Sequence, residues 1–250
     1  MNSRRSELLI LLGLLGAGAA LYGLRWALFP DPAFHNEMWR FLVGDVGFLC
    51  LQVALVTLIL DRLLRNRERQ AMLQKLNMVI GAFFSEVGTE LLGQIAVADS
   101  GLGEVRADLI PQMSWTDTQY QAAEQAVARH SPRIDIDQGR LERLKTMLVA
   151  RKPFLLGLLG NQSLLEHERF TELLWAVTHL AEELDARSDF AAIPEADRIH
   201  LVGDIKRVYA LLTLQWLSYL QHLQAQYPYL FSLAARVNPL DPDAHVEISA

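Results

Sequence analysis

Two long apolar stretches open the chain, and the rest follows the three-to-four-residue spacing of amphipathic helices. Residues 8–29 contain Arg25 as their one charged side chain, and residues 41–60 contain only Asp45. At a rise of about 1.5 Å per residue, each stretch can cross a hydrocarbon core of about 30 Å. Prolines in the intervening residues 30–38 are expected to stop a helix there. The pattern predicts a transmembrane helical hairpin within residues 1–61.

Basic residues at the ends of these stretches set the expected orientation. Arg4 and Arg5 precede the first stretch, and a cluster of arginines follows the second. Because Lys and Arg are retained on the cytoplasmic side, we expect a multi-pass protein of the cell inner (cytoplasmic) membrane with both termini in the cytoplasm. One alternative stays open, since basic residues, an apolar run and the small residues 17–19 also resemble a cleavable signal peptide.

The first stretch also carries a face of small residues suited to helix packing. These membrane-packing candidates are Gly16, Ala19, Ala20 and Gly23. Their spacing would let a second helix approach closely, and we expect that helix to come from another copy of the chain. Arg25 and Asp45 are expected at matching depths, so they could pair across the hairpin; alternatively, Arg25 extends to the interface.

Residues 62–98 form a basic segment that continues into an amphipathic helix. Residues 62–75 hold five basic side chains and one acidic one. The candidate contacts to lipid headgroups are Arg62, Arg65, Arg67 and Arg69. Such a segment suits anionic headgroups, although the positive-inside bias alone also explains it. Leu76, Ile80, Phe83 and Val87 then recur at steps of three and four, as on a helix with one buried face.

Residues 99–250 read as a series of helices without a period-two strand. Including the amphipathic helix, the expected elements are 63–98, 117–130, 137–150, 153–159, 163–187, 195–226 and 229–236. Thr116, Asp137 and Ser163 occupy capping positions, and Pro194 and Pro228 mark a beginning and an end. The predicted fold is all-α: a two-helix transmembrane hairpin followed by a cytoplasmic multi-helix bundle.

Composition narrows the classes of function. The chain has 250 residues, 51% of them hydrophobic and 21% charged, so it can bury a substantial core. Cys50 is the one cysteine, which excludes a disulfide scaffold. The formal charge of −6 argues against general nucleic-acid binding, which gains from a broadly basic surface. No motif indicates a catalytic residue, and no cofactor is predicted.

The densest group of potential metal ligands lies in two neighbouring expected helices. Glu172, His179 and Glu183 are on the first, and His200 and Asp204 are four residues apart on the second. These side chains could bind a metal ion. However, the Glu-x-x-His pair of di-metal carboxylate helices is missing, and a solvated acidic face is the alternative. The other histidines, including His130 and His167, are expected to be surface or cap residues.

The sequence is similar to a known family along most of residues 62–243. The strings KLNMVIGAFFSEVG from Lys75, LLEHERFTELLWAVTHLAEEL from Leu164, HLVGDIKRVYALL from His200 and YPYLFSLAARVNPLDP from Tyr227 resemble a family of uncharacterised prokaryotic membrane proteins with an N-terminal helical hairpin. The resemblance implies a prokaryotic cytoplasmic membrane and a shared helical domain. It implies no catalytic residue.

Two functions follow from the sequence. The first is a membrane-anchored helical interaction or signalling module without catalysis, which contacts the lipid bilayer, itself as a homo-oligomer, or another protein. The alternative is a metal-dependent enzyme or metal-binding helical bundle that uses the five ligands named above. The sequence leaves open whether the protein is an enzyme, and we prefer the hypothesis of a function without catalysis.

Overall fold

The fold is known from a computed structural model that describes residues 20, 23–24, 27–28, 32–161, 164 and 167–247. The chain divides into two compact units, Met1–Glu68 and Arg69–Ala250. Most of the first apolar stretch therefore lies outside the described residues, as do Gly16, Ala19 and Arg25. Of the expected Arg25–Asp45 pair only Asp45 is described, and the residues of the signal-peptide alternative lie outside the described part.

The second apolar stretch belongs to a long helix, α2 (Pro32–Phe83). The helix begins at Pro32, whereas residues 30–38 were expected to form a non-helical connection. A proline is compatible with a first helical turn, because the amide that it lacks has no intrahelical acceptor there. The expected connection therefore extended too far along the chain, because residues 32–38 already belong to helix α2.

No helix in the described part of the chain meets the length and apolarity needed to cross a bilayer. Residues 41–60 instead lie inside α2, which continues through Arg62 and Arg65 to Phe83. The finding contradicts the expected multi-pass location in the cytoplasmic membrane, so that prediction is wrong, and the transmembrane hairpin is not supported.

Apolar side chains on the described part of α2 in the first unit are exposed. Phe48 is 69% exposed, and Leu58 is 66% exposed. Among the side chains that the structure describes in this part of α2, the exposed large apolar residues are Phe48, Leu49, Val53, Leu55, Val56, Leu58, Ile59, Leu60, Leu63 and Leu64. Arg62, Arg65 and Arg67 are also exposed, and Arg65 lies 3.5 Å from Asp61 in an ion pair. Contact of these arginines with lipid stays a prediction.

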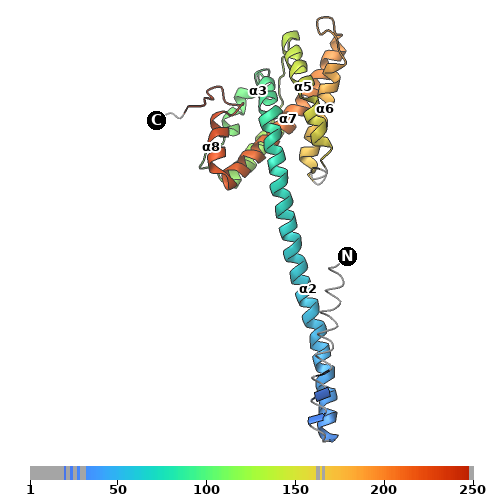
Figure 1. The fold of residues 1–250 in the computed structure, drawn as a ribbon. Helices are drawn as coiled ribbons and strands as arrows, with labels where there is room; N and C mark the ends of the chain where they lie inside the picture. Colours follow the sequence, from blue (N-terminus) through green and yellow to red (C-terminus); the bar gives the residue numbers. More distant parts are fainter. Residues whose placement is uncertain are drawn as a thin grey trace. The chain divides into compact units, whose positions relative to one another are not determined.

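The second unit is built from helices, which confirms the all-α prediction for the described residues (Figure 1). After α2 come the π-helical turn η1 (Phe84–Gly88) and α3 (Thr89–Ala96), then the 3₁₀ turns η2 (Leu102–Glu104) and η3 (Arg106–Leu109). The remaining helices are α4 (Asp117–Arg129), α5 (Gln138–Leu159), α6 (Glu168–Asp185), α7 (Glu195–Gln226) and α8 (Pro228–Arg236).

Helix α7 is the centre of this unit. It contacts α3, α4, α6 and α8, and α5 packs against α6. Trp216 of α7 is 2% exposed, and its ring lies 5.0 Å from that of Phe84. Phe83 packs edge-on against Phe170 of α6 at 5.4 Å. These aromatic contacts join α7, α6 and the segment around η1 in one hydrophobic core.

Local signals in the sequence placed most helix ends. Thr116 and Gln119 form the expected capping box of α4, and the Asp137 side chain accepts the Arg140 amide of α5. One difference is that α5 continues through Pro153, although two helices were expected. Another is the start of α6, where the His167 ring accepts the Phe170 amide. Ser163 lies outside the described residues.

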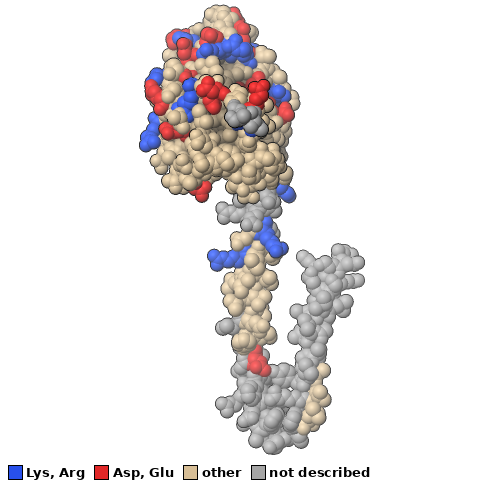
Figure 2. Space-filling model, turned by 90° about the vertical axis from the view of Figure 1, so that its left-hand side faces the viewer, with Lys and Arg blue, Asp and Glu red and all other residues tan. Residues whose placement is uncertain are grey.

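Charged side chains are unevenly distributed over the second unit. On the face that Figure 2 shows, most Lys, Arg, Asp and Glu lie in the upper half of the unit, and the lower half is largely uncharged.

Candidate metal centre

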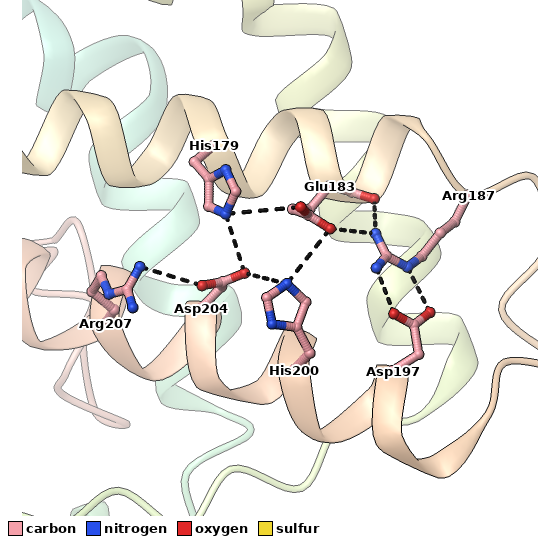
Figure 3. Close-up of polar contacts among 7 residues, drawn as sticks. All are labelled: His179, Glu183, Arg187, Asp197, His200, Asp204 and Arg207. Atoms are coloured by element: carbon pink, nitrogen blue, oxygen red, sulfur yellow. Dashed lines mark hydrogen bonds and ion pairs between the residues drawn. The ribbon is translucent and has the colours of Figure 1, made fainter.

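Two helices bring matching pairs of side chains together. On α6, His179 and Glu183 are four residues apart, and on α7 the same spacing separates His200 and Asp204. Side chains four residues apart lie on the same helix face. A short connection joins α6 to α7, and the two helices run antiparallel, so each histidine lies opposite the carboxylate of the other helix (Figure 3).

The four side chains form a ring of nitrogen and oxygen atoms. His179 Nε2 lies 3.8 Å from Glu183 Oε1 and 3.5 Å from Asp204 Oδ2. His200 Nε2 lies 3.7 Å from Glu183 Oε2 and 3.4 Å from Asp204 Oδ2. These distances exceed the 2.7–3.2 Å typical of N–H···O hydrogen bonds. In both histidines it is the Nε2 atom that faces the space between the carboxylates.

Burial differs strongly around this ring. The Asp204 side chain is only 6% exposed, whereas those of His179 and His200 are 47% and 52% exposed. The Asp204 Oδ2 atom is buried and has no hydrogen-bond partner, although it points at both imidazoles. A buried acceptor without a partner costs about 1–3 kcal/mol. The ring thus has a buried acidic side and an accessible histidine side.

Arg187 fixes the Glu183 carboxylate. Its guanidinium donates to Glu183 Oε2 at 2.8 Å and to the Glu183 carbonyl, and it makes two hydrogen bonds of 2.6 and 2.8 Å to Asp197. The hydrogen bond from Arg187 is the main cause that lowers the pKa of Glu183, with smaller contributions from the two histidines. Arg187 lowers the pKa of Asp197 in the same way. Both carboxylates are therefore held in the ionised state.

A second arginine lies beside the other carboxylate of the ring. Arg207 Nη1 is 3.5 Å from Asp204 Oδ1, the oxygen that does not face the histidines. Figure 3 therefore shows three carboxylates and two guanidiniums around two imidazoles. With neutral imidazoles, these groups have a formal charge of −1, which favours a cation over an anion.

The donor set fits a divalent transition-metal ion. Zinc and related ions bind imidazole nitrogen and carboxylate oxygen at about 2.0–2.2 Å, which places neighbouring ligand atoms about 3.0–3.6 Å apart. The four distances in the ring, 3.4 to 3.8 Å, need only a small contraction to reach that range. One ligand atom each of His179, Glu183 and His200 lies within 4.8 Å of the other two, and Asp204 is not part of this tighter group.

Four of the five ligand candidates from the sequence meet in this ring, and Glu172 does not. Glu172 lines a groove between α4, α6 and α7, together with residues such as Gln121, Glu124 and Arg169. Sequence reasoning missed Arg187 and Arg207, which touch the carboxylates. The four-residue spacing of His179–Glu183, repeated in His200–Asp204, was the signal that could have identified the ring.

His130 is the C-cap residue of α4, as one of its two expected roles allows, and its ring makes a contact that the sequence did not predict. Its Nε2 atom lies 2.6 Å from Asp99 Oδ2, and the Asp99 side chain is fully buried. The other Asp99 oxygen accepts the amides of Gly101 and Arg133. The pair joins the segment after α3 to the segment after α4, so its role in the fold is structural.

Fold and cluster together define a class: an all-α protein of two units whose larger unit places two histidines and two carboxylates on one antiparallel helix pair. The family model described as "Uncharacterized protein MJ1433, C-terminal helical domain" matches residues 72–236. A second, "MJ1433, N-terminal helical domain", matches residues 2–64.

The chain belongs to the MJ1433 family. It is 41% identical over 241 residues to the uncharacterized protein MJ1433 of Methanocaldococcus jannaschii, and the match covers 96% of each chain. No solved structure matches. The expected resemblance to an uncharacterised helical family is thus confirmed, whereas the membrane character attached to it is not supported.

Proposed function

We propose that the helical domain binds a divalent metal ion between α6 and α7. The ring formed by His179, Glu183, His200 and Asp204 carries this proposal. Two histidines and two carboxylates converge on one space, and each imidazole nitrogen lies 3.4 to 3.8 Å from an oxygen on either side. The burial of Asp204 Oδ2 without a hydrogen-bond partner also supports the proposal.

Simple ion pairing explains this arrangement less well. In a surface ion pair, long side chains gain little and orient loosely. Here a carboxylate oxygen is buried beside two nitrogens at distances too long for hydrogen bonds. A cation in the ring would interact with both carboxylates and with the lone pairs of both neutral imidazoles.

Metal binding to the purified full-length chain tests the proposal. After treatment with a chelator and its removal, we expect Co²⁺ or Zn²⁺ to bind with one ion per chain in a calorimetric titration. His179→Ala and His200→Ala should each weaken binding at least tenfold. Glu172→Gln is the matched control, since it removes an acid on α6 outside the ring. Absence of binding, or equal affinity in all four proteins, refutes the proposal.

A second candidate function, a helical interaction module, has its own supporting observation. The apolar residues of α2 between Phe48 and Leu64 are exposed in the single chain, and large exposed apolar surfaces mark interaction sites. We propose that a second copy of the chain covers them. The mass of the wild type measured by light scattering should be at least twice the chain mass. The mass of Ile59→Glu should be lower than that of the wild type. Val97→Glu, at another exposed apolar residue, is the control, and a monomeric wild type refutes this candidate.

A further inference from the structure

We propose that the ring selects a first-row transition-metal ion over Ca²⁺ and Mg²⁺, and that Arg187 and Arg207 enforce the selection. Each arginine contacts one oxygen of a ring carboxylate, which limits that carboxylate to one metal bond. The inference rests on the proposed metal binding and adds which ions bind and which residues decide it.

Arg187 contacts its ring carboxylate more closely than Arg207 does. Its side chain is only 17% exposed, and it contacts Glu183 and Asp197 at the same time. Because Asp197 lies in the first turn of α7, Arg187 is fixed between the two helices that supply the ligands. The Oε2 atom of Glu183 accepts from Arg187 at 2.8 Å and lies 3.7 Å from His200 Nε2, whereas Oε1 makes the contact with His179. Because the hydrogen bond from Arg187 occupies Oε2, Oε1 is the Glu183 oxygen that is free to bind a metal.

Asp204 repeats the division of oxygens with Arg207. Its Oδ1 atom faces Arg207 at 3.5 Å, and its Oδ2 atom faces both imidazoles. The Arg207 side chain is 63% exposed, so its contact is weaker than that of Arg187. On both helices, therefore, an arginine contacts one carboxylate oxygen and leaves the other to the ring, but on Glu183 the oxygen that Arg187 contacts also lies 3.7 Å from His200 Nε2.

Coordination chemistry converts this pattern into selectivity. Ca²⁺ takes six to eight oxygen ligands and commonly uses both oxygens of a carboxylate. Mg²⁺ also prefers oxygen and binds imidazole poorly. The ring offers two nitrogens and two single oxygens, a set that suits Zn²⁺, Co²⁺, Ni²⁺ or Cu²⁺. Removal of an arginine would free a second carboxylate oxygen and add a net negative charge, and both changes favour Ca²⁺.

Competition between ions tests the inference. The full-length protein is loaded with Co²⁺, and the visible Co²⁺ spectrum is followed while Ca²⁺ or Mg²⁺ is added. We expect the wild type to keep Co²⁺ at a thousandfold excess of either ion. In Arg187→Gln and Arg207→Gln, the ratio of Co²⁺ to Ca²⁺ affinity should fall by about tenfold or more. Arg198→Gln is the control, because Arg198 pairs with Glu195 outside the ring.

The ratio separates selection from simple loss of structure, since a distorted site would lose affinity for both ions together. Arg207→Gln alters an exposed side chain and keeps the test open if Arg187→Gln fails to fold. Unchanged ratios in the arginine variants overturn the inference, as does displacement of Co²⁺ by Ca²⁺ in the wild type. If Co²⁺ does not bind to the wild type at all, the proposed metal-binding function itself is wrong.

Discussion

Asp204 on α7 places a buried carboxylate oxygen 3.5 Å from the Nε2 atom of His179 on α6. That oxygen has no hydrogen-bond partner, and its other near neighbour is the imidazole of His200. An unsatisfied buried acceptor is costly, so the helix pair is expected to gain stability when a cation occupies the ring.

The first prediction concerns this gain. Saturation with Zn²⁺ at 100 times its Kd should raise the free energy of unfolding by about 2.7 kcal/mol, because the ion binds the folded chain. A chelator should reverse the gain, as measured by thermal unfolding. Asp204→Asn should show no response to Zn²⁺, while Asp185→Asn, on α6 outside the ring, should respond like the wild type. An equal response of both variants would contradict the prediction.

The ring shows which parts of a site can be inferred from a sequence. The pairs His179–Glu183 and His200–Asp204 are local, since a four-residue spacing within one helix fixes each of them. Their meeting depends on the register of two antiparallel helices, which the packing of buried residues such as Leu180 and Leu201 determines. Glu172 shares a helix with His179 but lies two turns away, so the packing places it in a different groove.

The same distinction applies to the fold. Capping residues such as Thr116 and Asp137 act within one helical turn, and the ends that they mark were predicted. Pro153 looked like a break in the sequence, yet α5 continues through it because its buried residues pack on both sides, from Met147 to Leu155. The contact between His130 and Asp99 joins residues 31 positions apart and leaves no local pattern.

The second prediction concerns acid. Arg187 lowers the pKa of Glu183 below 4.5 and that of Asp197 below 3.8, their ordinary values. A lowered folded-state pKa means that both carboxylates stabilise the fold above these values and lose that contribution as the pH falls through the folded-state pKa. Urea unfolding of the metal-free protein should therefore show falling stability below about pH 4.5.

Arg187→Gln is the matched test of this pH dependence. The variant should be less stable at pH 6, because two carboxylates lose their partner. It should also lose less stability between pH 6 and pH 3, since the pKa values of Glu183 and Asp197 return toward their ordinary range. The same loss in variant and wild type would show that other groups cause the acid sensitivity.

The third prediction concerns Gly88, the last residue of the π-helical turn η1. A Cβ atom there would lie 2.6 Å from Phe84 Cδ1 and 2.8 Å from Phe83 Cε1. Both rings are tightly packed, so Gly88→Ala should lower the free energy of unfolding by about 1–3 kcal/mol. Gly203→Ala is the control, because nothing lies within 4 Å of its added Cβ. Alanine should stabilise α7 there by up to about 1 kcal/mol. Denaturant titration measures the free energy of unfolding of both variants. A change in the same direction in the two variants would contradict the prediction.

The fourth prediction concerns Asn238, which is fully buried beside Trp216. Its Oδ1 atom accepts the Trp216 indole N–H at 3.0 Å and the Leu240 amide at 3.2 Å, and its amide nitrogen donates to the Leu109 carbonyl. Asn238→Leu has a similar size but leaves three buried polar groups without partners. At about 1–3 kcal/mol for each group, the free energy of unfolding should fall by at least about 3 kcal/mol.

Two further variants separate the polar contribution from the packing. Trp216→Phe removes one donor and part of the ring, so it should cost less stability in combination with Asn238→Leu than in the wild type, because the indole N–H has already lost its acceptor. Gln94→Leu, at a more exposed amide that donates to Glu90, should change stability by less than about 0.5 kcal/mol. Strictly additive effects of Asn238→Leu and Trp216→Phe in denaturant titrations would show that the hydrogen bond between them contributes nothing to folding.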